Sequence, residues 1–124
     1  MYNTVIDKTD KIMVSIINSI KNCIKLTVDR KDFIYHITES TKKINNGSFV
    51  LSLRLCSRYD ETKIKYLVFI VNKDIRTGVY TVNILDGNMN APSIIFSTSD
   101  NYPVHKIEKY VPNIIISTEN MIMI

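Results

Sequence analysis

The sequence predicts an α+β fold in which one or two N-terminal helices pack on an antiparallel sheet of about five strands. Two observations predict it. Apolar residues recur at helical spacing early in the chain, and from Ser48 onward they alternate or form short runs between turn residues. The length fits one domain, residues 1–124, which is long enough to bury a core without a disulfide or a structural metal.

The first helix is expected between Lys8 and Thr27. Polar residues such as Lys11, Ser15 and Asn18 line the side opposite an apolar stripe. The stripe consists of Ile12, Met13, Ile16, Ile17, Ile20, Cys23 and Ile24. A stripe of this width normally lies against a sheet, and a helix that binds a membrane surface or a partner is the alternative.

Residues 30–44 are compatible with two structures. Phe33, Ile34 and Ile37 lie near helical spacing, and Asn46-Gly47 is suited to close a helix. The same segment is rich in strand formers, and Asn46-Gly47 is equally suited to turn a hairpin. We expect a second helix here and keep the strand as the alternative.

Strands are expected from Ser48 to Cys56, from Lys63 to Lys73 and from Val79 to Leu85. The centre of the second, Tyr66 to Val71, is apolar on both faces, which indicates a strand in the middle of the sheet. Two further strands are expected where Pro-Ser-Ile-Ile-Phe-Ser-Thr (92–98) is nearly repeated as Pro-Asn-Ile-Ile-Ile-Ser-Thr (112–118). Proline belongs at the first residue or the edge of a strand, and β-branched residues suit the strand behind it. Between them, a turn of helix is expected at His105–Tyr110.

Composition indicates the type of genome that encodes the protein and the compartment in which it is expected. The chain has 21 Ile and a single Ala, which indicates an AT-rich gene such as that of a virus or phage. No apolar signal segment and no run of about eighteen apolar residues is present, so we expect no membrane partner. Cys23 and Cys56 have no metal or redox spacing and are expected to be reduced thiols. We therefore expect an intracellular, reducing location, the host cytoplasm if the protein is viral.

Residues suited to catalysis are sparse, so we expect no cofactor, no metal and no small-molecule substrate. His36 and His105 stand in no metal-ligand spacing, and the three glycines form no phosphate-binding loop. The exception is Asp60-Glu61-Thr62-Lys63, because a Glu-x-Lys with an upstream acid occurs in metal-dependent nucleases. A nuclease centred on Glu61 and Lys63 is the third of three functional hypotheses.

A basic hairpin is the candidate binding site. If Tyr59–Thr62 forms a short turn, Arg58 lies opposite Lys63 and Cys56 opposite Lys65. Four basic residues then share one sheet face with a tyrosine at its tip: Arg54, Arg58, Lys63, Lys65 and Tyr59. Such a face suits an acidic protein surface or nucleic acid. The distribution of net charge also favours an acidic partner, since residues 1–65, which contain the hairpin, carry +5 and residues 66–124 carry −1.

The apolar C-terminus is the second candidate, with Met121, Ile122, Met123 and Ile124 following the last expected strand. These residues either extend that strand into the core or along the sheet edge, or they pack on another subunit. The leading hypothesis is a non-enzymatic protein that acts by binding a protein partner or by self-association. A nucleic-acid-binding module that uses the basic hairpin is the alternative.

Overall fold

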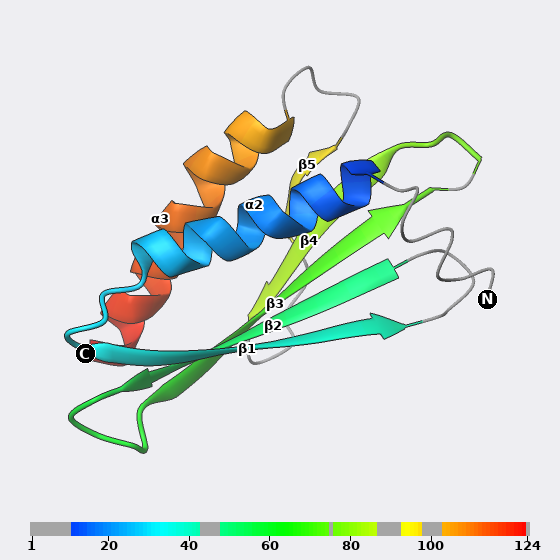
Figure 1. Cartoon of the computed structure of the whole chain (residues 1–124). Coiled ribbons are helices and arrows are strands. Elements are labelled where there is room, and N and C mark those ends of the chain that lie inside the picture. The colour runs from blue at the N-terminus through cyan, green and yellow to red at the C-terminus, as the bar shows by residue number, and fades with distance from the viewer. Residues whose placement is uncertain (1–10, 43–47, 75, 87–92, 98–102, 124) are drawn as a thin grey trace.

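A computed structural model describes residues 11–42, 48–74, 76–86, 93–97 and 103–123 of the chain. One helix, α2 (Lys11–Thr27), precedes five strands, and a second helix, α3 (Pro103–Met123), follows them. The strands are β1 (Phe33–Lys42), β2 (Ser48–Ser57), β3 (Ile64–Lys73), β4 (Tyr80–Asp86) and β5 (Ser93–Ser97). The predicted α+β class is confirmed, with helices at both ends of the strand series (Figure 1).

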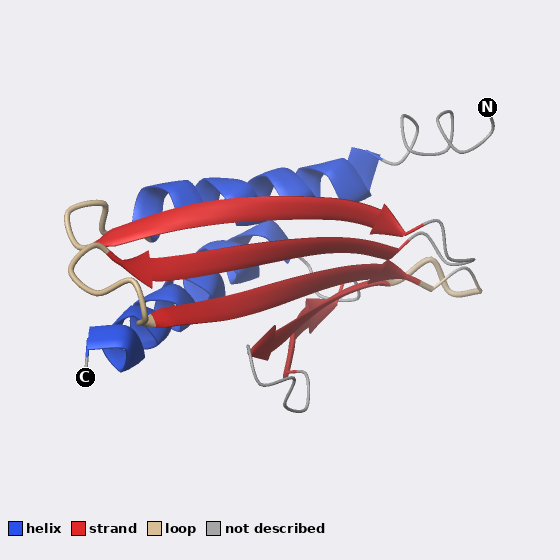
Figure 2. Ribbon diagram, turned by 90° about the horizontal axis from the view of Figure 1, so that it is seen from below, coloured by secondary structure: helices blue, strands red, loops and turns tan. Residues whose placement is uncertain are grey.

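The strands form one antiparallel sheet in the order β1-β2-β3-β4-β5, so each strand pairs with its neighbours in sequence. Only the β4–β5 ladder is irregular among these pairings, with a register shift between Val82 and Asn83. Both helices lie on the same face of the sheet and pack against each other (Figures 1 and 2). Figure 2 views the other face, on which neither α2 nor α3 lies.

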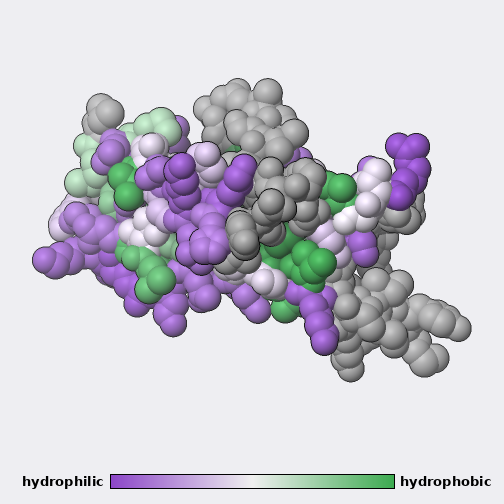
Figure 3. Space-filling model, turned by 90° about the horizontal axis from the view of Figure 1, so that it is seen from above, coloured by the Kyte–Doolittle hydropathy of each residue, from purple (hydrophilic) through white to green (hydrophobic). Residues whose placement is uncertain are grey.

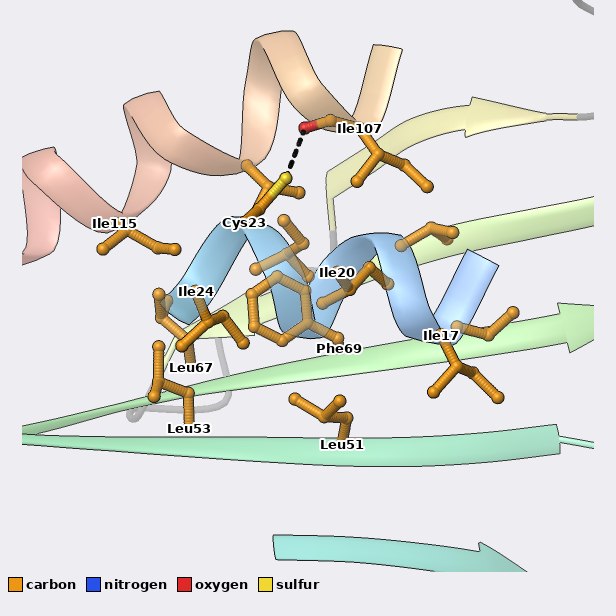
Figure 4. Packing of buried hydrophobic residues seen from close by; sticks show 14 of the residues in the cluster. Ile17, Ile20, Cys23, Ile24, Leu51, Leu53, Leu67, Phe69, Ile107 and Ile115 are labelled. Carbon is orange, nitrogen blue, oxygen red and sulfur yellow. Dashed lines mark hydrogen bonds between the residues drawn. The ribbon is translucent and has the colours of Figure 1, made fainter. Parts of the chain in front are cut away.

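The core lies between this sheet and the two helices. Alternate residues of the central strands point toward the helices because side chains alternate along a strand. Isoleucines of α2 meet them from above, as Figure 4 shows for Ile20 and Ile24 over Leu53, Leu67 and Phe69. The fully buried sheet residues are Leu51, Leu53, Leu55, Phe69, Val71 and Val82.

The expected helix at 30–44 is wrong, because Phe33–Lys42 is strand β1. Burial follows a period of two: Phe33 is buried and Tyr35 and Ile37 are half-buried, while Ile34 and His36 are exposed. The apolar spacing that suggested a helix therefore mixes residues of two sheet faces. The strand propensity of the segment decides its structure once β2 is available for pairing.

The expected strand at 112–118 is also wrong, because these residues belong to α3. The helical turn expected at His105–Tyr110 is confirmed as part of the same helix. Ile107, Val111, Ile115 and Ile122 are buried at helical spacing on both sides of Pro112. A proline inside a helix costs about 3 kcal/mol because it removes one backbone hydrogen bond. Burying several isoleucines, at about 1.5–3 kcal/mol each, exceeds that cost. The second helix thus lies at the C-terminus, and one of the five strands is β1 instead of residues 112–118.

Neither described helix is long and apolar enough to span a membrane.

Candidate functional site

The sheet face turned away from the helices is left uncovered by α2 and α3 (Figure 2). We call it the open face. Its members alternate with the buried residues along β1 to β4, and their register places them in rows across the sheet. They are Ile34, His36, Thr38, Ser48, Val50, Ser52, Arg54, Cys56, Ile64, Tyr66, Val68, Ile70, Asn72, Thr81, Asn83 and Leu85, of which only Cys56 is buried.

Arg54 lies near the middle of the open face. It stands directly opposite His36 on β1 and Tyr66 on β3, so the three residues form one row. Tyr66 is 45% exposed and Arg54 is half-buried. Among the described residues, Arg54 makes neither a hydrogen bond nor an ion pair. Its positive charge is therefore unmatched within the described part of the fold.

Aliphatic side chains surround this row. Val68 lies opposite Leu85, and Val50 lies opposite Ile70, and all four are half-buried. Ile34, on the other side of the row, is 47% exposed. No aspartate or glutamate belongs to the open face. The open face thus combines aliphatic side chains with uncharged polar ones such as Thr38 and Ser52 around one central arginine.

The helix side of the molecule differs from the open face. Figure 3 shows this side, where hydrophilic residues predominate among those drawn in colour and hydrophobic ones form separate patches. The exposed apolar residues of the helices include Leu26 on α2 and Ile116 on α3. Scattered exposed apolar residues are ordinary on protein surfaces, whereas a contiguous patch indicates an interaction site.

The basic hairpin does not form as expected, because the β2–β3 register differs by one residue on one strand. Cys56 pairs with Ile64, and Lys65 pairs with buried Leu55. Lys65 therefore belongs to the helix-covered face and Arg54 to the open face. The turn is also longer than expected: the Ser57 amide donates to the Lys63 carbonyl at 3.0 Å.

Arg58 and Tyr59 contact the turn between α2 and β1. The Arg58 side chain donates through Nε to the Arg30 carbonyl at 2.7 Å, and the Tyr59 hydroxyl donates to Asp32 Oδ1 at 2.9 Å. The Asp32 carboxylate raises the pKa of Tyr59 through this hydrogen bond. These two side chains hold neighbouring turns together, and only Arg54 of the five predicted residues lies on the open face.

The nuclease residues lie in the β2–β3 turn. Asp60 Oδ1 accepts hydrogen bonds from the Thr62 amide at 3.0 Å and the Thr62 hydroxyl at 2.6 Å, and these bonds lower the pKa of Asp60. Asp60 thus stabilises its own turn, while Glu61 and Lys63 are exposed. Within the described ranges, no three His, Cys, Asp or Glu side chains converge as ligands for a metal ion.

The C-terminal residues form the last turn of α3 and not a strand. Ile122 is buried in the core, whereas Met121 and Met123 are exposed. Ile124 lies outside the described residues. Ile122 therefore packs into the core, as one of the two alternatives predicts. Met121 and Met123 lie at the surface, where the other alternative, contact with another subunit, requires them.

The carboxyl group of Glu119 is the one strongly buried acid among the described residues. It accepts a hydrogen bond from the Asp29 amide at 2.9 Å, which ties α3 to the end of α2. Burial raises the pKa of Glu119, and the nearby Asp29 and Asp32 carboxylates add to the effect. Because Glu119 bonds to the backbone of the described fold, we assign it a structural role.

The open face was missed at the level of sequence, although one signal pointed to it. Tyr66 to Val71 is apolar on both faces, which predicts a strand in the middle of the sheet, and β3 is the central strand. In the structure only the Leu67, Phe69 and Val71 side is covered by helices. Comparison with known proteins adds nothing to this assignment: no protein-family model, no curated protein and no solved structure matches the chain.

Proposed function

We propose that the protein acts by binding another protein through the open face, with Arg54 as the central charged contact. The observation that supports this proposal is the unmatched charge of Arg54 among half-exposed apolar side chains. A half-buried cation without a counter-charge is unfavourable, and a carboxylate supplied by a partner relieves that cost. The partner surface is therefore apolar with an aspartate or glutamate facing Arg54.

Residue types support the same proposal. Tyrosine and arginine are enriched among the residues that contribute most to protein–protein binding, and such residues lie near the centre of an interface. Tyr66 and Arg54 are adjacent in one row with aliphatic residues around them. An interface core is typically poor in acidic residues, and the open face has none.

A mutational comparison tests the proposal. The tagged protein is produced in the cells in which it naturally occurs, and co-purified proteins are quantified by mass spectrometry. Arg54→Glu and Tyr66→Ser change the open face, and Lys25→Glu is the control because Lys25 is exposed on α2. We expect a partner that is retained by the parent and by Lys25→Glu and is reduced at least about tenfold by both open-face changes.

A charge exchange gives the sharper result. When Arg54→Glu abolishes binding, replacing the facing acidic residue of the partner with Lys restores it. A partner that binds all variants equally well, or no stoichiometric partner at all, contradicts the proposal.

Nucleic acid is the second candidate, because one specific observation favours it. An exposed tyrosine beside an arginine and a histidine on an antiparallel sheet offers a base a stacking surface and a phosphate a cation. The proposal ranks lower because Lys65 lies on the opposite face and Arg58 is engaged in the α2–β1 turn. The test is the binding of a fluorescent single-stranded oligonucleotide. If this binding weakens steeply as salt is raised and is lost in Arg54→Glu, the open face binds nucleic acid and not a protein.

A further inference from the structure

Strand β1 is one of the two edge strands of the described sheet. Its ten residues pair with β2 without interruption, and no described strand pairs with its other side. Proteins usually protect such an edge with a proline, a bulge, a short strand or an inward-pointing charge. β1 contains neither a proline nor a bulge, and its one inward charge, Glu39, forms an ion pair with Lys21 at 2.7 Å and keeps 42% of its side chain exposed.

The backbone groups that face outward can be assigned. The Arg58 amide donates to the Asp32 carbonyl, so even-numbered residues of this segment direct their backbone groups toward β2. The N–H and C=O groups of Tyr35, Ile37 and Glu39 consequently point away from the sheet, whereas the Phe33 amide already donates to the Asp29 carbonyl at 2.9 Å. They form the hydrogen-bonding edge that an added antiparallel strand needs.

We propose that a second copy of this chain pairs with β1 in antiparallel orientation, with the two-fold axis at Ile37. In this register Ile37 faces Ile37 of the second copy, and Tyr35 faces its Glu39. A two-fold axis perpendicular to the sheet places the helices of both copies on the same side. The five-stranded sheets join into one, and the two open faces become a single continuous surface.

Charge complementarity favours this occupant and this register. Arg30 Nη2 donates to the Tyr35 hydroxyl at 3.2 Å, and the Arg30 guanidinium lies 5.7 Å from the centre of the Tyr35 ring. The Tyr35 hydroxyl acts as the acceptor in this contact, so its O–H remains able to donate to the facing Glu39 carboxylate of the second copy. Each copy supplies both halves of this contact, so it forms twice.

Other symmetric registers are less favourable. An axis at Glu39 places two carboxylates directly opposite each other, and like charges in that position repel. An axis at His36 places two imidazoles opposite each other and moves Tyr35 away from Glu39. Only registers that keep residues of the same sheet face opposite each other are possible, because a two-fold axis perpendicular to the sheet leaves each face on its own side.

Light scattering on the purified chain tests the proposal. We expect a mass of twice 14.3 kDa at micromolar concentrations. His36→Lys with Thr38→Lys is expected to give monomers, because these exposed residues face each other across the proposed axis. Asn113→Lys with Ser117→Lys adds the same charge to exposed positions of α3 and is expected to remain dimeric.

Cysteine cross-linking tests the register itself. His36 and Thr38 of the second copy form a non-hydrogen-bonded pair with Cα atoms about 4.5 Å apart, which a disulfide can span. In a Cys56→Ala background, His36→Cys with Thr38→Cys should give a covalent dimer on mild oxidation, whereas each single change should not.

Each contrary result overturns the proposal: a monomeric parent, a dimer that persists in His36→Lys with Thr38→Lys, or a dimer without the specific cross-link. The edge and the open face share His36 and Thr38, but Arg54 lies on β2 and not at the edge. Arg54→Glu is expected to remain dimeric, so loss of one interface can be told from loss of the other.

Discussion

Two neighbouring residues at the end of α3 are expected to differ sharply in their contribution to stability. Ile122 is 4% exposed and Met123 is 50% exposed. Replacing each with Ala removes an apolar side chain of similar size from the same helical turn. The comparison therefore separates docking of the C-terminal residues into the core from any role at the surface.

The expected magnitude follows from burial. Ile→Ala in a core costs about 2–5 kcal/mol, through lost transfer free energy and the cavity left behind. The last turn of a helix can relax into part of the cavity, and Ala is the better helix former by some tenths of a kcal/mol. We expect about 2 kcal/mol for Ile122→Ala. Met123→Ala is expected to change the free energy of unfolding by no more than about 0.5 kcal/mol.

Urea unfolding followed by circular dichroism measures both changes. With a slope of about 1–3 kcal/mol per M for a small protein, the midpoint of Ile122→Ala should fall by about 1 M. The slope itself should be unchanged. Equal midpoints for the two variants, or a larger loss for Met123→Ala, would refute the placement of Ile122 in the core.

Three further results are expected. Glu119→Gln should raise the melting temperature at neutral pH: the pKa of Glu119 is higher in the folded than in the unfolded state, so its ionised form destabilises the fold above that pKa. This gain should shrink as the pH falls through the folded pKa toward the unfolded one, and a gain that is constant with pH would contradict the assignment. Gly78→Ala should lower stability by about 1–2 kcal/mol in thermal unfolding, because φ is 72° there, although no atom lies within 4 Å of an added Cβ. Cys23 and Cys56 are buried, and burial raises the pKa of Cys23, so both thiols should react slowly with a thiol reagent until the protein is unfolded; rapid labelling of the folded protein would contradict this.

Local patterns predicted much of the secondary structure. The alternation from Leu51 to Leu55 is buried as its period predicts, and so is the stripe from Ile12 to Ile24 with the exception of Ile12 itself, which is 51% exposed. These predictions hold because the residues that set the period all pack on one neighbouring layer. The hairpin register could not be predicted in the same way. A shift of one residue moved Lys65 to the other face, and it depended on the length of a turn that Asp60 and Thr62 stabilise.

The sequence by itself determined the α+β class, the first helix and the positions of β2, β3 and β4, because these depend on periodicities within single segments. Tertiary structure alone decided that residues 33–42 pair with β2 and that residues 112–118 join a helix. In both segments local propensity was divided, and the choice depended on apolar surface and hydrogen-bonding partners supplied from elsewhere in the chain. Tertiary structure also decided which face of the sheet the helices cover. Two helices of this length bury one face, and this is why Arg54 and its apolar neighbours remain uncovered by either helix.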